Sequence, residues 1–218
     1  MIAAGKGELG ERDRIRGALV EIAGEEGYTK KLTMERVLER AGVEREDFDR
    51  LYGDWDECLV DNWLGIMREE FWPRSEAAFA KGGDDWRESL RYQAWDLLRF
   101  LEEDIPRARF LIEASLLEEA VQANRDVAMS RMVDNFHLGR FERDNGDLIP
   151  RAAAEALVGA VWNGIAQNIQ PPVDYDALRG GSPQILYLTM MAYVGEEAAQ
   201  EELRRGPEDL ERYERGEL

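Results

Sequence analysis

Hydrophobic residues recur at helical spacing along most of the chain, and glycines and prolines separate the periodic segments. In the first segment the apolar positions are Ile15, Leu19, Ile22 and Ala23. A repeat of three to four residues is typical of a helix with one buried face, whereas a strand alternates every second residue. Such alternation is scarce here. The pattern therefore predicts an all-α protein of about nine helices and no sheet.

Residues that start or stop helices set the expected boundaries. Thr33 is expected to cap a short second helix, and Gly42 to end it in the left-handed conformation. Pro73 is expected to kink a long fourth helix, because proline has no backbone donor. Ser182 and Pro183 match an N-cap and a first helical residue, so we expect the last helix to run from about 183 to 199. The segment 201–218 is mostly charged and is expected to be frayed or only partly helical.

The charge balance limits the possible partners. The chain has 28 Lys and Arg residues against 46 Asp and Glu residues, a formal net charge of −18. Such a surface repels nucleic acid and anionic membranes at long range. An acidic surface of this kind also increases solubility and is typical of proteins that function in high salt. No stretch approaches the roughly 18 apolar residues of a membrane span. The N-terminus lacks the apolar run of a secretory signal, so a cytoplasmic protein without membrane contact is expected.

Candidate catalytic chemistry is sparse. The single cysteine, Cys58, excludes an intramolecular disulfide framework, and the single histidine, His137, excludes a site that needs two. We find no nucleophile–base constellation, no phosphate-binding glycine loop and no metal-ligand spacing. Carboxylate pairs will occur by chance in so acidic a chain. We expect neither an enzyme, nor a cofactor, nor a metal site.

The first sixty residues carry a more specific motif. It consists of Gly27-Tyr28, Thr33-Met34-Glu35-Arg36-Val37, Ala41-Gly42-Val43, Phe48, Tyr52-Gly53 and Glu57-Cys58-Leu59. In these residues the chain resembles the TetR family of bacterial transcriptional regulators, which open with a three-helix DNA-binding unit. The number, length and order of the later helices also fit. The resemblance implies a helix-turn-helix domain over residues 1–55, a helical ligand-binding and dimerisation domain over 56–200, and a charged tail over 201–218.

The motif has a physical basis in the turn. Gly42 supplies a positive φ without a Cβ penalty, and the following helix, about Glu44 to Tyr52, would then lie in the major groove. The resemblance implies that DNA is contacted from both sides of this turn. The candidate contacts are Lys30, Lys31, Thr33, Arg36, Arg45 and Arg50.

The same helix departs from the family pattern in its charge. Where the family usually has a capping Ser, a backbone-contacting Tyr and a phosphate-binding Lys, this chain has Glu44, Asp49 and Trp55. Glu46 and Asp47 replace small or hydroxyl residues, so that 43–57 holds seven acids and two bases. Acids in a first turn stabilise a helix by about 0.3–1 kcal/mol each. They also occupy the position where a phosphate would bind. Two hypotheses follow: a DNA-binding regulator, or a TetR-fold dimer that has lost or changed its DNA partner and acts as a ligand- or protein-binding module.

The resemblance further implies an effector pocket in the later helices, for a small apolar or amphipathic molecule. For any single one of the large side chains there, an ordinary core position is the favoured alternative. His137 forms an i, i+3 pair with Asp134 and is compatible with a capping, solvent-facing or pocket role. The candidate ligand contacts are Trp63, Met67, Phe71, Trp95, Phe100, Phe110, Met132, Phe136, His137 and Trp162.

Small residues line one face of the penultimate helix, and such a stripe lets another helix approach closely. In the family this helix and the last one pair with their symmetry mates in a four-helix bundle, which implies a twofold homodimer. The alternative is packing within one chain. The candidate interface residues are Ala153, Ala156, Leu157, Ala160, Val161, Gly164, Ile185, Leu188, Thr189 and Ala192. The family mechanism implies a repressor that leaves operator DNA when its ligand binds and moves the fourth helix.

Overall fold

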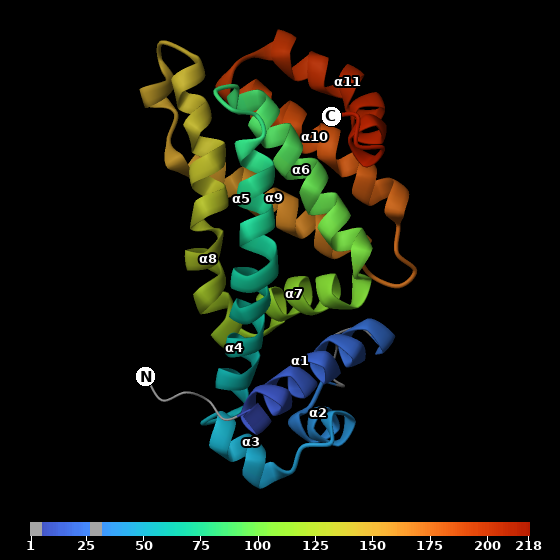
Figure 1. Ribbon diagram of the computed structural model, residues 1–218. Coiled ribbons are helices and arrows are strands. Elements are labelled where there is room, and N and C mark those ends of the chain that lie inside the picture. Colours follow the sequence, from blue (N-terminus) through green and yellow to red (C-terminus); the bar gives the residue numbers. More distant parts are fainter. Residues whose placement is uncertain (1–5, 27–31) are drawn as a thin grey trace. The chain divides into compact units, whose positions relative to one another are not determined.

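The computed structural model describes residues 6–26 and 32–218, and every regular element in these ranges is a helix (Figure 1). The predicted all-α class is confirmed, although these ranges hold eleven α-helices rather than about nine. The α-helices are α1 (Lys6–Glu26), α2 (Met34–Ala41), α3 (Arg45–Leu51), α4 (Trp55–Ile66), α5 (Trp72–Ala80), α6 (Trp86–Glu103), α7 (Ile105–Leu117), α8 (Glu119–His137), α9 (Arg151–Asn168), α10 (Tyr175–Tyr193) and α11 (Glu196–Glu214). A π-helical turn η1 (Met67–Phe71) and the 3₁₀ turns η2 (Leu138–Glu142) and η3 (Gly146–Leu148) complete them. None of the described helices is both long and apolar enough to cross a membrane.

The chain forms two compact units. The head unit comprises the residues up to Glu69 together with Asp104–Arg125, and the body unit comprises Glu70–Glu103 together with Asp126–Leu218. The head unit thus contains α1–α4 and α7, whereas the body unit contains α5, α6, most of α8 and α9–α11. The compact head unit includes α4 and α7 as well as the first three helices. The expected boundary near residue 55, between a DNA-binding and a ligand-binding domain, concerns function and stays a prediction.

Local sequence rules explain the turn between α2 and α3. The Oγ1 atom of Thr33 accepts a hydrogen bond from the backbone N–H of Arg36, which caps α2 as expected. Gly42 has φ +60°, and its neighbour Val43 donates its N–H to the carbonyl of Leu38 at 3.1 Å. This is the glycine-terminated C-cap that the sequence predicts, because glycine adopts positive φ without steric cost.

Helix α7 is tied closely to α1 and α4 within the head unit. A Cβ atom on Gly24 of α1 would lie 2.6 Å from the ring of Pro106, so only glycine fits at this crossing. Arg109 donates to the Gly24 carbonyl at 2.7 Å. From α4, the Nε1 atom of Trp63 donates to the carbonyl of Leu111 at 2.9 Å. These contacts make α7 part of the framework that carries the first three helices.

Around Pro73 the structure has two helices separated by a π-helical turn, where the sequence predicts one long helix kinked at the proline. Helix α4 ends at Ile66, the π-helical turn η1 follows, and Pro73 lies in the first turn of α5. A proline is tolerated there because a first-turn N–H has no helical partner. The structural break therefore falls in η1, just before the proline.

The prediction that the last helix starts at Pro183 and ends near residue 199 is wrong. Helix α10 starts at Tyr175, where the Asp174 side chain accepts the N–H of Ala177 at 2.9 Å, and Pro183 lies inside it. It ends at Tyr193, before Gly195, which has φ +135°. Buried apolar residues on both sides of the proline hold the helix together against the local breaker. Tertiary packing overrides the local signal here.

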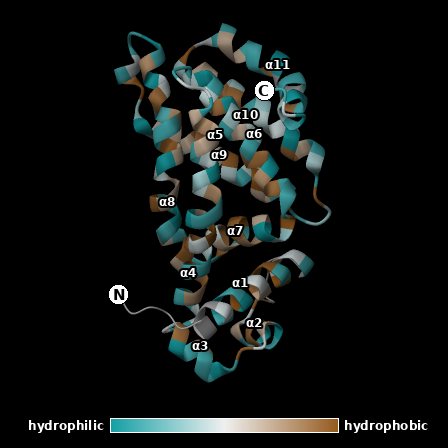
Figure 2. Cartoon of the chain, in the orientation of Figure 1, coloured by the Kyte–Doolittle hydropathy of each residue, from teal (hydrophilic) through white to brown (hydrophobic). Residues whose placement is uncertain are grey.

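The expectation of a frayed C-terminal segment is also wrong, because α11 is a packed helix that extends to Glu214. Figure 2 shows it as largely hydrophilic, in contrast to the hydrophobic α7. Leu210 and Tyr213 are nevertheless buried. The strongest attachment is an ion pair in which the Nε and Nη2 atoms of Arg91 on α6 contact the carboxylate of Glu202, and both side chains are at most 5% exposed. Burial alone would lower the pKa of Arg91, but its bonds to Glu202 outweigh this and raise it.

Substituting Arg91→Met should leave the buried Glu202 carboxylate without its partner. Removing one member of a buried ion pair costs about 3–5 kcal/mol, so the free energy of unfolding in urea should fall by that amount. The matched control is Arg131→Met, whose pair with Glu76 has side chains 62% and 54% exposed. The control should lose less than about 1 kcal/mol. Equal losses in both variants would contradict the view that the α6–α11 pair holds the C-terminal helix in place.

Candidate recognition surface and ligand cavity

Helix α3 is positioned by one arginine of α1. Arg12 donates to Asp61 of α4 at 2.7 Å and to the carbonyl of Leu51, the last residue of α3, at 2.8 Å. Its guanidinium also lies 4.6 Å from the ring centre of Tyr52. The Tyr52 hydroxyl in turn accepts from Asn62 at 3.2 Å, and burial raises the Tyr52 pKa. The C-terminal end of α3 is thus fixed to two neighbouring helices.

The basic residues of α3 are both paired with acids of the same helix. Arg45 donates to Asp49 at 2.7 Å, and Arg50 contacts Asp47 at 2.8 Å and Glu11 of α1 at 3.4 Å. Glu44 stands at the N-cap but makes no side-chain capping bond. Helix α3 and its N-cap thus hold four acids against two arginines, and each arginine is compensated by an acid of the same helix.

The other candidate DNA contacts lie on or before α2. Thr33 is exposed while it caps α2, and Arg36 is half-buried. Lys30 and Lys31 lie outside the described residues. Thr33, Arg36, Arg45 and Arg50 are thus placed on the two helices of the helix-turn-helix, and their contacts with DNA stay a prediction.

The lone cysteine of the head unit has no chemical role at this surface. Cys58 is fully buried, and burial raises its thiol pKa to about 12. Its thiol is therefore neutral at physiological pH and a poor nucleophile. The residue belongs to the core of the head.

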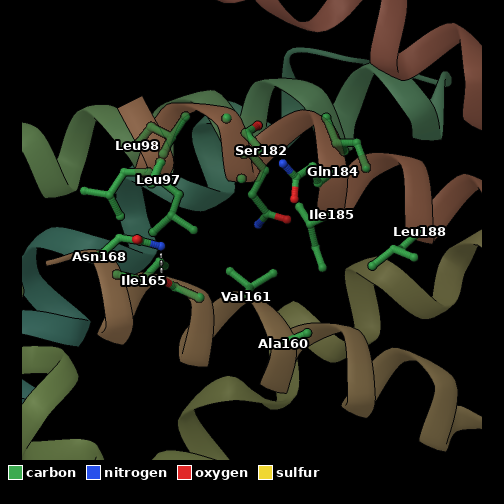
Figure 3. A pocket seen from close by; sticks show the side chains of 18 of the residues that line it. Leu97, Leu98, Ala160, Val161, Ile165, Asn168, Ser182, Gln184, Ile185 and Leu188 are labelled. Atoms are coloured by element: carbon green, nitrogen blue, oxygen red, sulfur yellow. Dashed lines mark hydrogen bonds between the residues drawn. The ribbon is translucent and has the colours of Figure 1, made fainter. Parts of the chain in front are cut away.

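The body unit contains a cavity of about 490 Å³ between α6, α8, α9 and α10, which falls in the usual range for small-molecule sites (Figure 3). Leu97 and Leu98 of α6 close one side, Val161 and Ile165 line the cavity from α9, and Ile185 lines it from α10. The full lining is Leu90, Gln93, Ala94, Leu97, Leu98, Met132, Phe136, Ala160, Val161, Gly164, Ile165, Asn168, Asp176, Ala177, Leu178, Gly180, Gly181, Ser182, Gln184, Ile185, Leu186 and Leu188.

Only two of the ten candidate ligand contacts, Met132 and Phe136, line this cavity. The remaining eight are buried elsewhere. Those in the head unit are Trp63, Met67 and Phe110, and those in the body unit are Phe71, Trp95, Phe100, His137 and Trp162. His137 has its Nδ1 atom 3.3 Å from the Tyr193 hydroxyl, and burial together with nearby Arg140 and Arg151 lowers its pKa. These eight residues build the cores of the two units.

Half of the candidate dimer residues line the cavity instead of lying apart from it. They are Ala160, Val161, Gly164, Ile185 and Leu188. Leu188 of α10 is nevertheless 49% exposed. Ala156 of α9, which does not line the cavity, is also exposed. Thr189 is fully buried and donates to the carbonyl of Ile185 at 2.7 Å. Ala153, Leu157 and Ala192 are half-buried. The cavity lining and the candidate interface therefore share residues of α9 and α10.

Two solved structures share the fold described above. A TetR-like transcriptional regulator from Rhodococcus sp. RHA1 superposes with a TM-score of 0.58 at 19% sequence identity, over 85% of this chain and 96% of its own. A TetR family transcription regulator from Marinobacter aquaeolei VT8 gives a TM-score of 0.56 at 14% identity, over 86% of this chain and 97% of its own. No family model and no curated protein matches the sequence. The chain thus has the fold of TetR-family transcription regulators, as its first sixty residues led us to expect.

The cavity wall should tolerate an added methyl group at Gly181. A Cβ atom there would meet no atom within 4 Å, so Gly181→Ala should raise the free energy of unfolding by about 0.5–1 kcal/mol through helix propensity. The matched control is Gly139→Ala, whose Cβ would lie 2.4 Å from the Trp86 ring. The control should destabilise by about 1–3 kcal/mol. Urea denaturation of both variants checks this, and a destabilised Gly181→Ala would mean that the wall is closed at this point.

Proposed function

We propose that this chain is a TetR-like transcriptional repressor that binds operator DNA as a homodimer and leaves it when a small apolar or amphipathic effector occupies the cavity of the body unit. The observation that carries the proposal is the helix-turn-helix of the head. In it, Thr33 caps α2, Gly42 makes the turn, and Arg12 fixes the end of α3. This arrangement presents α3 in the way that recognition helices are presented to a major groove. We assign the chain no catalytic role.

The route from cavity to head follows the chain itself. Helix α6 contributes Gln93 and Leu97 to the cavity, and it continues through Asp104 into α7. The Asp104 side chain accepts the N–H of Arg107 at 2.9 Å and so caps α7, which contacts α1. An effector that binds one arrangement of α6 better than another would therefore bias the head. The effector can shift the equilibrium between the two arrangements only by as much as its affinities for them differ.

The second connection between the units runs through η1. The boundary between Glu69 and Glu70 falls inside this π-helical turn, directly after α4. Such turns are frequent at functional positions in helices. We assign η1 the role of the joint at which α4 follows the body in the proposed mechanism.

The homodimer is proposed on the outer face of α9 and α10. Small residues on α9, among them Ala156 and Ala160, permit close approach of a second helix. Leu188 and Met191 on α10 add exposed apolar surface. Two recognition helices, one from each copy, would then contact successive turns of the major groove.

One observation favours the second candidate, a dimer of this fold without a DNA partner. Arg45 and Arg50 are both engaged by acids of the head, within a segment of seven acids and two bases. Like charges at an interface cost several kcal/mol each. Specific binding exceeds non-specific binding by only about 4–10 kcal/mol, so a few such clashes would consume the margin.

The proposal is tested by fluorescence anisotropy with duplex DNA from around the chain's own gene. At low salt, where electrostatic attraction is strongest, the protein should bind at least one of these duplexes more tightly than a scrambled duplex of equal length. Absence of binding to either kind of duplex at low salt would favour the second candidate.

Replacing the acids of α3 separates the two candidates more sharply. The variant carries Glu44→Ser, Glu46→Ala, Asp47→Thr and Asp49→Tyr, which releases Arg45 and removes four negative charges. The control carries Glu155→Ser, Glu197→Ala, Glu208→Thr and Glu211→Tyr, which makes the same change of charge on exposed residues of the body unit. Affinity for the scrambled duplex should rise at least tenfold in the first variant and much less in the control. Equal gains would show that net charge alone, and not the charge of α3, limits binding.

The dimer is tested with Ala156→Arg, which places a charge on the exposed face of α9. Analytical ultracentrifugation at micromolar concentration should show a dimer for the unchanged chain and a monomer for this variant. The control is Val127→Arg on α8, at a residue that is 75% exposed, and it should stay dimeric. A monomeric unchanged chain would exclude the proposed assembly.

A further inference from the structure

We infer that the cavity of the body unit binds an uncharged molecule that has an apolar body and at least one O–H or N–H group. The inference rests on the effector site proposed above and names the chemical class of its ligand. Three features of the lining carry it: two buried polar atoms without partners, the absence of a cation, and a wall opened by glycines.

The first of the two buried polar atoms belongs to the side chain of Gln93. It is 3% exposed, and its Nε2 atom donates to the Oγ of Ser75 at 2.9 Å. This bond fixes the amide and leaves Oε1 buried without a hydrogen-bond partner. An amide oxygen can only accept, so the group that satisfies it must be a donor. Buried polar atoms are almost always hydrogen-bonded, which makes a ligand donor the natural partner.

The second polar atom is the hydroxyl of Ser182 on α10. The residue is 6% exposed, and its Oγ also has no hydrogen-bond partner. A hydroxyl both donates and accepts, so it can serve the same ligand group as Gln93 or a neighbouring oxygen. Gln93 and Ser182 both line the cavity, one from α6 and the other from α10.

The charges of the lining decide against an anionic ligand. No Lys or Arg is among the 22 lining residues, and Asp176 at an exposed position is the only titratable one. A carboxylate or phosphate would enter without a counter-ion, inside a protein of net charge −18. Burying an unpaired charge is strongly unfavourable. Fatty acids and phosphorylated molecules are therefore excluded in favour of alcohols and amides.

The third feature is the room left by Gly164, Gly180 and Gly181. Each lines the cavity, and a Cβ on any of them would meet no atom within 4 Å. The open space between α9 and α10 thus follows from missing side chains. A larger residue at Gly181 would fill this space without a clash against the backbone.

The inference is tested by isothermal titration calorimetry of the full chain with three probes of equal chain length. They are 1-decanol, its isomer methyl nonyl ether, which lacks the donor, and decanoate, which carries a charge. 1-Decanol should bind at least tenfold more tightly than either of the others. Equal affinities for the three probes, tighter binding of decanoate, or no binding of 1-decanol would each overturn the inference.

Variants locate the hydrogen bonds. Gln93→Met and Ser182→Ala should each weaken 1-decanol about fivefold, as the loss of one neutral hydrogen bond predicts. Gln93→Met should leave the ether unchanged, because the ether has no donor for the Gln93 oxygen. Ser182→Ala places a good helix former in α10, so it keeps the test valid if the loss of the Gln93–Ser75 bond unfolds the other variant. The control Gln167→Met removes an exposed amide of α9 that does not line the cavity, and it should change neither affinity. Gly181→Leu should weaken all probes that bind. Unchanged 1-decanol affinity in both Gln93→Met and Ser182→Ala would refute the assignment.

These outcomes are independent of the proposed regulatory function, because the titration contains no DNA. Selective binding of 1-decanol to a protein that ignores every duplex would support the ligand class and refute the repressor. Duplex binding by a protein that does not distinguish the three probes would do the reverse.

Discussion

Pairing between arginine and carboxylate is the interaction on which this structure depends, because acids outnumber bases by 46 to 28. Buried acids are accommodated where an arginine reaches them, as with Glu202 and Arg91, or Asp96 and Arg74 at 2.8 Å. The same pairing organises the head, where Arg12 joins three helices. It also engages the two arginines of α3. An interaction that stabilises the fold therefore lowers the positive potential that a recognition helix could offer to DNA.

The short-range features of the fold are predictable because local chemistry decides them. Thr33 and Gly42 act at helix ends through their own hydroxyl and backbone, and no distant residue is needed. Two local signals gave wrong predictions because distant residues decide these regions: Pro183 as a helix start, and the charged segment 201–218 as a frayed end. Helix α10 continues through Pro183 because its flanking residues are buried, and α11 is held by Glu202, whose partner lies 111 residues away in sequence. Packing of this kind is not visible in a pattern of nearby residues.

The position of the cavity does not follow from the pattern of large side chains, because large side chains fill space. Trp63 and Phe110 are among the most buried residues of the chain and belong to a core. A cavity arises where side chains are missing, and Gly180-Gly181-Ser182-Pro183 within α10 was the available signal. Five of the residues that line the cavity are also candidate dimer residues. Since five residues belong to both, a ligand in the cavity and a second copy on α9 and α10 would influence each other's binding.

We propose that the ligand cavity and the recognition helix are coupled through α6 and α7. The most direct test is the affinity of the protein for a duplex that it binds specifically, measured by anisotropy with and without saturating 1-decanol. Allosteric coupling is usually worth about 5- to 150-fold in affinity, and we expect 1-decanol to weaken duplex binding within this range. An unchanged duplex affinity, under conditions where calorimetry shows the cavity to be occupied, would contradict the account.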